Sequence, residues 1–134
     1  MVASSKTLMW EIPLKTVSEA NGVKVKKANG KYRSEHWSET GKRHRQQKEI
    51  IQLVLKKEII KATLPCHINL TRISTRKLDY DNLVSSQKYV LDSICDLLIP
   101  GLAPGRADGD PRITTNYRQE KGKIQGIRIE ITSL

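Results

Sequence analysis

The chain has 134 residues, and 24 Lys and Arg against 14 Asp and Glu give it a formal net charge of +10. Its apolar runs, such as Leu97–Ile99, are far shorter than the roughly 20 residues that span a bilayer, which argues against a membrane protein. The length predicts a single domain over residues 1–134. The positive charge favours a polyanionic partner, nucleic acid first.

The numbers and positions of the Cys and His residues exclude several classes of site. Cys66 and Cys95 cannot staple a domain of this size, so we expect reduced thiols in a cytoplasmic protein, and charged residues interrupt any apolar signal segment near the start. The scattered His36, His44 and His67 indicate neither a zinc site nor a Ser-His-Asp triad. The sequence contains no Gly-rich phosphate loop, so we expect no nucleotide cofactor.

In the first half of the chain, residues 8–12 alternate between apolar and polar side chains, which predicts a strand. A lysine-rich region with the turn signals Asn21-Gly22 and Asn29-Gly30 follows, and it is either a β-hairpin or a mobile basic loop. A helix is predicted from Ser38, as the N-cap, to Ala62. Its apolar residues are Ile50, Ile51, Val54, Leu55 and Ile59.

In the second half, residues 66–71 alternate again and are predicted as a half-buried strand. A second helix is predicted over residues 82–98, followed by a loop. Residues 112–119 and 124–132 are predicted to pair as a hairpin around residues 121–123. This order of elements predicts an α+β domain, in which two main helices pack on a small mixed β-sheet.

Two aspartates stand two residues apart directly before the second predicted helix, in Asp79-Tyr80-Asp81-Asn82. In extended backbone, Asp79 and Asp81 would point to the same side, with their backbones about 7 Å apart. Mg²⁺ takes hard oxygen ligands and is often held by one or two carboxylates plus substrate phosphates, so the pair is a candidate magnesium site. The alternative is that Asp81 or Asn82 merely caps the helix, and both functions can hold together.

Two further patterns carry charge near this pair. Asp108 and Asp110, split by Gly109, are candidates for a third metal ligand if their loop returns to the start of the helix, and the alternative is a Gly/Pro turn. Helical spacing puts Lys88 on the same face as Asp81, where it would stabilise charge on a phosphate. The alternative is a solvated helix surface in which Lys88 pairs with the aspartate four residues later. The whole polar stripe consists of Asp81, Ser85, Lys88, Asp92 and Asp96.

Together these residues resemble the RusA family of Holliday junction resolvases, which phages and prophages often carry. The resemblance is strongest over residues 78–112. It consists of the Asp-x-Asp-Asn-Leu run at Asp79–Leu83, a lysine in the following helix with an aspartate four residues later, and acids in the next loop. Asp81 and Lys88 are seven residues apart where the best-known form of the family's motif has four, and both spacings return to nearly the same helix face. The loop acids, adjacent in the family, are split by Gly109 here.

The resemblance implies a RusA-like homodimer that resolves four-way DNA junctions by paired symmetric nicks, in recombination and repair, with Mg²⁺ or Mn²⁺ as cofactor. It implies that Asp79, Asp81 and Asp110, or Asp108 in its place, bind the metal and are catalytic, with Lys88 as the catalytic lysine. The alternatives are a non-catalytic basic DNA-binding module and a metal nuclease acting on other branched DNA. Basic segments are predicted to grip the DNA backbone. Their residues are Lys24, Lys26, Lys27, Lys42, Arg43, Arg45, Arg72, Arg76 and Lys77.

Overall fold

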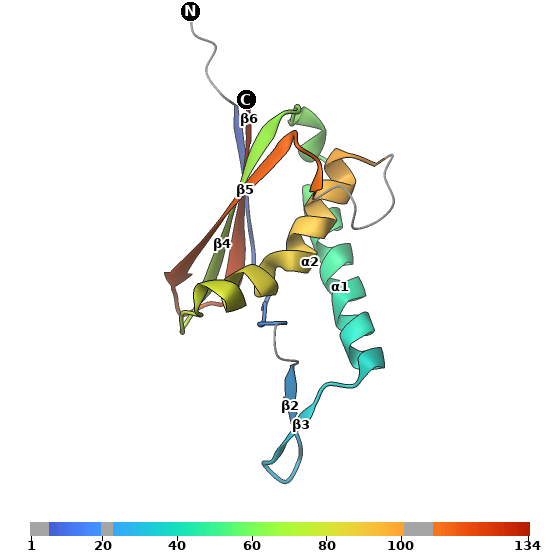
Figure 1. Cartoon of the computed structure of the whole chain (residues 1–134), viewed down its shortest axis with the longest axis vertical. Coiled ribbons are helices and arrows are strands. Elements are labelled where there is room, and N and C mark those ends of the chain that lie inside the picture. The colour runs from blue at the N-terminus through green and yellow to red at the C-terminus, as the bar shows by residue number, and fades with distance from the viewer. Residues whose placement is uncertain (1–5, 20–22, 101–108) are drawn as a thin grey trace, which may run out of the picture.

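The protein has a mixed α+β structure in which a four-stranded sheet lies against two long helices (Figure 1). The computed structural model describes residues 6–19, 23–100 and 109–134. In these ranges, neither long helix is apolar enough over a sufficient length to cross a membrane. The predicted α+β class, with a small mixed sheet and two main helices, is confirmed.

The strands and helices follow one another in the predicted order. Strand β1 (Thr7–Ile12) is followed by the short strands β2 (Lys24–Lys26) and β3 (Tyr32–Ser34), and then by helix α1 (Trp37–Leu55). A 3-10 turn, η1 (Ile59–Lys61), leads to strand β4 (Cys66–Ser74) and helix α2 (Tyr80–Leu98). The described chain ends with strands β5 (Ile113–Lys121) and β6 (Gly126–Ser133).

The sheet has the order β1-β6-β4-β5, with β4 and β5 parallel and the other pairs antiparallel. The predicted hairpin between the last two strands is therefore wrong, because β4 lies between β5 and β6. The connection after β5 crosses the end of β4, where the Gly122 N–H donates to the Ser74 carbonyl at 3.0 Å. Since β4 pairs along both edges, the middle of the sheet is built on the strand that leads into α2.

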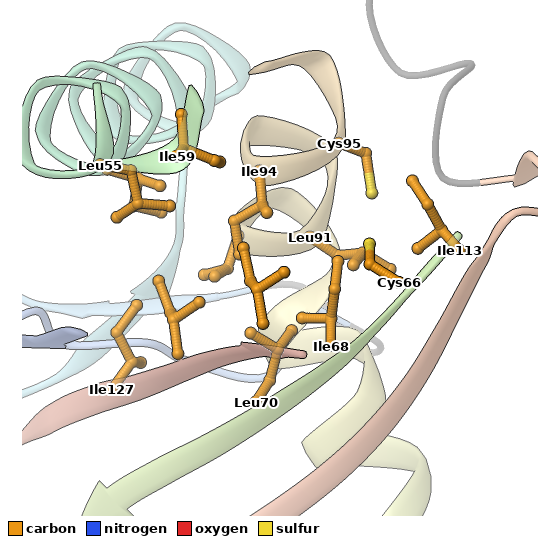
Figure 2. Packing of buried hydrophobic residues seen from close by; sticks show 14 of the residues in the cluster. Leu55, Ile59, Cys66, Ile68, Leu70, Leu91, Ile94, Cys95, Ile113 and Ile127 are labelled. Atoms are coloured by element: carbon orange, nitrogen blue, oxygen red, sulfur yellow. The ribbon is translucent and has the colours of Figure 1, made fainter. Parts of the chain in front are cut away.

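The core lies between the helices and the facing side of the sheet (Figure 2). Alternate residues of β4, including Ile68 and Leu70, are fully buried there, as predicted from the period of two. From α2, Ile94 is also fully buried in this layer. Cys66 and Cys95 are both buried thiols, and burial raises the pKa of the Cys66 thiol. The same packing that forms the core thus fixes α2 along the sheet.

Both ends of α1 differ from the prediction. The N-cap is His36 rather than Ser38: the His36 side chain accepts from the Ser38 N–H, and Glu39 closes a capping box with the His36 backbone. The helix ends at Leu55 instead of reaching residue 62, and after a turn Ile59 of η1 is buried against the core. The local sequence thus predicts the position of the helix but not its exact ends.

The apolar side chains of α1 are only partly buried. Ile51 and Leu55, four residues apart, are fully buried, whereas Ile50 and Val54 are 41% and 42% exposed. Leu53 is 77% exposed. The predicted apolar face of this helix was therefore too wide, because α1 contacts the core along one narrow row.

Strands β2 and β3 form a separate two-stranded antiparallel ribbon, which stands away from the four-stranded sheet beside the start of α1 (Figure 1). Its turn is closed by a hydrogen bond from the Lys27 N–H to the Lys31 carbonyl at 2.7 Å. Gly30 takes a positive φ of 85°, which glycine adopts without steric cost. Of the two alternatives left open for this region, the hairpin is the one observed.

Gly126, the first residue of β6, is in close contact with β1. A Cβ atom added at Gly126 would lie 2.8 Å from the backbone oxygen of Ile12, so one of the two paired strands would have to shift. We expect Gly126→Ala to lower the free energy of unfolding by about 1–3 kcal/mol, as overpacking does. Urea denaturation measures the change. Gly109→Ala is the control, since an added Cβ there meets nothing within 4 Å, and equal stability of the two variants would contradict this account.

Candidate functional site

The candidate site lies at the N-terminal end of α2. Asp79 is the N-cap residue, with extended backbone (φ −60°, ψ 155°), but its carboxylate makes no capping hydrogen bond. Asp81 and Asn82 lie inside the first turn, so the alternative that one of them caps the helix is wrong. Both aspartates are exposed. The fold therefore leaves the Asp79 carboxylate without a capping function, at a helix end where negative charge is stabilised.

Asp81 shares a surface hollow with the lysine predicted to act beside it. The hollow has a volume of about 360 Å³, and its lining includes Asp81, Ser85 and Lys88 from α2 and Tyr117 from β5. Asp81 and Lys88 thus lie on one face of α2, as their spacing predicts. Asp79 and Asp81 do not share one extended segment as predicted, because Asp81 is helical.

The loop before Asp79 is held to the sheet by two side chains. Gln119 on β5 accepts from the Leu78 N–H and donates to the Leu78 carbonyl, both at 2.8 Å. Its register partner on β4, Arg72, donates to the Arg76 carbonyl at 3.0 Å. These contacts fix the backbone that carries Asp79. Sequence analysis missed Gln119, because no local pattern links it to Leu78, 41 residues away in the chain.

The hydrogen bonds of Gln119 give a prediction for stability. Gln119→Leu keeps the approximate size of the side chain but leaves the Leu78 N–H and carbonyl without this partner. We expect the free energy of unfolding to fall by about 1–2 kcal/mol, the usual cost of losing hydrogen bonds of this kind. Thermal denaturation is the measurement, with Gln46→Leu on the exposed surface of α1 as the control. A Gln119→Leu protein as stable as wild type would show that the loop is held by other contacts.

The segment after β1 packs against the first turns of α2. The Ser18 hydroxyl donates to Asn82 Oδ1 at 2.6 Å and lies 3.3 Å from the Ser85 hydroxyl. Further along the helix, the buried Gln87 side chain donates to the Thr16 hydroxyl at 3.1 Å. Asn82 of the Asp-x-Asp-Asn run thus anchors this segment. It does not cap the helix, and sequence analysis did not find this function.

The structure places Asp110 at the opposite end of β5 from the two aspartates of α2. It precedes β5 next to the start of β4, where the Arg112 carbonyl accepts from the Cys66 N–H at 2.9 Å. About 20 Å of strand, at the usual rise per residue, separates the first residue of β5 from Gln119 near Asp79. Both Asp110 carboxylate oxygens accept from Arg112 at 2.9 Å, and this guanidinium holds the pKa of Asp110 at about 2.

The described part of the chain therefore places no third carboxylate at the α2 site. Asp110 does not lie at the start of α2, because it directly precedes β5 beside the start of β4. Asp108 lies outside the described residues. Across residues 6–19, 23–100 and 109–134, no three Asp, Glu, His or Cys side chains form a group that could hold a metal ion. The acids at the site are Asp79 and Asp81.

The predicted polar stripe of α2 is divided between two places. Asp81 and Lys88 line the first hollow, whereas Asp92 and Asp96 line a second hollow of about 200 Å³ beside α1. There Lys48 of α1 donates to Asp96 at 3.2 Å. Asp81 and Lys88 therefore belong to the candidate site, whereas Asp92 and Asp96 belong to the contact between the two helices.

Arg43 lies in a half-buried ion-pair network. Its guanidinium donates to both carboxylate oxygens of Glu19, at 2.5 and 2.9 Å, and to both of Glu35, at 2.9 and 3.0 Å. The hydrogen bonds to Glu19 and Glu35 raise the pKa of Arg43. His44 Nε2 also lies 3.1 Å from Glu19. Arg43, which was predicted as a DNA contact, thus uses these donors to join α1 to the segments that carry Glu19 and Glu35.

Of the other cations predicted to contact DNA, Arg72 is not exposed, and the rest lie on three surfaces. Arg72 is half-buried, donates to the Thr16 carbonyl at 3.3 Å as well as to Arg76, and has its pKa lowered by burial. The exposed cations are Lys24, Lys26 and Lys27 on the ribbon, Lys42 and Arg45 on α1, and Arg76 and Lys77 in the loop before Asp79.

The chain matches no model of a known protein family, and a search of curated proteins finds no match. Its own residues therefore carry the functional conclusion. They are two exposed carboxylates at the start of α2, a lysine that shares a hollow with one of them, and exposed cations on the loop that leads into the site.

Proposed function

We propose that the chain is a magnesium-dependent endonuclease that cuts branched DNA, with the four-way junction as its substrate, as the resemblance to the RusA family implies. The observation that supports this most is the hollow shared by Asp81 and Lys88, next to the exposed Asp79. Metal-dependent hydrolysis of a phosphodiester uses carboxylates that bind the metal, and a nearby cation stabilises charge on the phosphate. The first turns of α2 carry both the carboxylates and the cation. The net charge of +10 favours binding of DNA by the chain as a whole.

The exposed carboxylates of Asp79 and Asp81 are hard oxygen ligands of the kind that magnesium takes, and substrate would supply part of the shell of the ion. Asp79 and Asp81 would be its protein ligands, and two carboxylates would suffice because Mg²⁺ usually retains waters and binds substrate phosphates. When bound, the ion polarises the phosphoryl group and lowers the pKa of a coordinated water. Lys88 stabilises negative charge on the phosphate. The N–H groups at the start of α2 favour an anion at the same place.

Asp110 has a structural function in this proposal. It holds Arg112 across the turn that begins β5, and the Asp110 carbonyl accepts from the Ile113 N–H at 3.1 Å. The resemblance implies a homodimer, and a two-fold dimer suits the symmetry of the substrate. Two copies related by a two-fold axis present two sites to a junction, and each site makes one of the paired nicks.

The test is cleavage of a synthetic four-way junction with and without Mg²⁺, beside linear duplex and flap substrates of the same sequence. We expect paired, symmetric nicks in the junction that require the metal, and little cutting of linear duplex. Equal cutting of flaps would assign the chain to nucleases of other branched DNA. Tight binding of the junction without any cut would contradict an endonuclease.

A second candidate function is a non-catalytic DNA-binding module. It is favoured by one observation, the double hydrogen bond that commits the Asp110 carboxylate to Arg112 and leaves two acids at the start of α2. Such a module binds DNA equally well without Mg²⁺. It also tolerates Asp81→Asn without loss, which an endonuclease does not.

A further inference from the structure

The ribbon formed by β2 and β3 carries a concentrated positive charge away from the body of the protein. Residues 23–34 contain four lysines and one arginine but no Asp or Glu. The ribbon stands beside the start of α1 and outside the four-stranded sheet (Figure 1). A protruding element with this charge is not required by the core, so its sequence is available for contact with a partner.

The two faces of the ribbon differ. Cross-strand partners share a face and neighbours along a strand alternate, so Lys24, Lys26 and Tyr32 lie on one face together with Ser34. Val25 and Arg33 lie on the other, where Arg33 pairs with Glu39 in the first turn of α1 at 2.6 Å. We call the first of these the outer face. Its two lysines are exposed and its tyrosine is 65% exposed.

The base of the ribbon is joined firmly to α1. The Glu35 N–H donates to the Val23 carbonyl at 2.7 Å, which continues the ribbon by one step. The Glu35 carboxylate in turn accepts from Arg43 and from the Thr40 hydroxyl at 2.6 Å. With the Arg33–Glu39 pair, these contacts hold the ribbon at a fixed place relative to the helix. It can therefore direct its outer face at one surface of a bound ligand.

We infer that the outer face of the ribbon lies in the major groove of a duplex DNA arm. The inference rests on the proposed action on DNA and adds the element that holds the duplex. The major groove of B-DNA, about 12 Å wide, admits a two-stranded β-ribbon, and phosphates line both of its edges. Lys24 and Lys26 on the outer face, with Lys27 and Lys31 at the turn, complement that charge.

The test is the salt dependence of duplex binding by the double variant Lys24→Gln/Lys26→Gln, measured with 20-base-pair DNA in the absence of Mg²⁺. Each lost phosphate contact lowers the slope of log K against log salt by about 0.9, so we expect a slope smaller by about 1.8. The matched control is Lys56→Gln/Lys57→Gln, two exposed lysines just after α1, about 28 Å of helix away from the ribbon. This control keeps the wild-type slope.

Interference by methylated bases identifies the groove. Guanines methylated at N7, which faces the major groove, reduce binding by wild type, and this interference disappears in the ribbon variant. Interference confined to adenine N3 in the minor groove, or tighter binding of single-stranded DNA, would overturn the inference. The inference would also be overturned if the salt dependence of binding by Lys24→Gln/Lys26→Gln had the same slope as that of wild type. If that slope is unchanged while junctions are still cut, the ribbon inference fails alone; if wild type binds no DNA, the proposed function fails as well.

Discussion

Asp81→Asn reduces metal-dependent cleavage of a four-way junction by about a thousandfold or more, while binding of the junction is retained. Asparagine keeps the size of the side chain but removes the negative charge that the metal requires. Losing a metal ligand at the reacting phosphate removes several kcal/mol of charge stabilisation, and about 4 kcal/mol corresponds to a factor of a thousand. Single-turnover cleavage at saturating protein measures the rate of the chemical step.

The control for this substitution is Asp96→Asn, which makes the same change in charge on the same helix. Asp96 faces α1 and pairs with Lys48, so its loss leaves the hollow of Asp81 and Lys88 intact. We expect cleavage by this variant within a few-fold of wild type. If both variants cut equally fast, the metal is not held at the start of α2.

Arg43→Met lowers the free energy of unfolding by about 2–4 kcal/mol, somewhat less than the cost of removing one partner from a fully buried ion pair, because this network is half-buried. Methionine can fill much of the space of the arginine stem but leaves Glu19 and Glu35 without their shared cation. The Glu35 side chain is 8% exposed and that of Glu19 is 16% exposed, so neither charge is well hydrated. Urea denaturation of wild type, Arg43→Met and the exposed neighbour Arg45→Met provides the comparison. A loss as small as that of Arg45→Met would mean that the network contributes little.

The same network makes stability depend on pH. Hydrogen bonds from Arg43 lower the pKa of Glu35, and at Glu19 the hydrogen bonds from Arg43 and His44 outweigh the burial that would raise its pKa. Both carboxyls thus have a lower pKa in the folded protein than the value of about 4.5 expected when unfolded. Their contribution is complete above pH 4.5 and is lost as the pH falls through the folded values. Arg43→Met therefore loses less stability than wild type on acidification.

Much of the architecture follows from local patterns. The strict alternation in β6 predicts Ile127, Ile129 and Ile131 on the buried side, and all three are fully buried. The pairing of strands is different, because the residues between β5 and β6 fit a tight turn as well as they fit a crossing over the end of β4. Whether two strands pair directly or through a third depends on the whole sheet, and β4 takes the central place.

The candidate site was predictable only in the part that lies on one helix. Helical geometry relates Asp81 to Lys88, and the structure brings them to one hollow. The contacts that position the site join distant segments, such as Ser18 with Asn82 and Gln119 with Leu78. Asp110 was placed wrongly for the same reason, since the path of a long loop cannot be derived from its own residues.

The most direct test of the central claim, a divalent metal at the start of α2, is a Mn²⁺ titration followed by ¹⁵N–¹H NMR. Mn²⁺ broadens the signals of nearby amides. The account predicts that residues 78–88 broaden first in wild type and in Asp96→Asn, and that this broadening is lost in Asp79→Asn/Asp81→Asn. Broadening that begins near Asp110, or that is the same in the double variant, would contradict it.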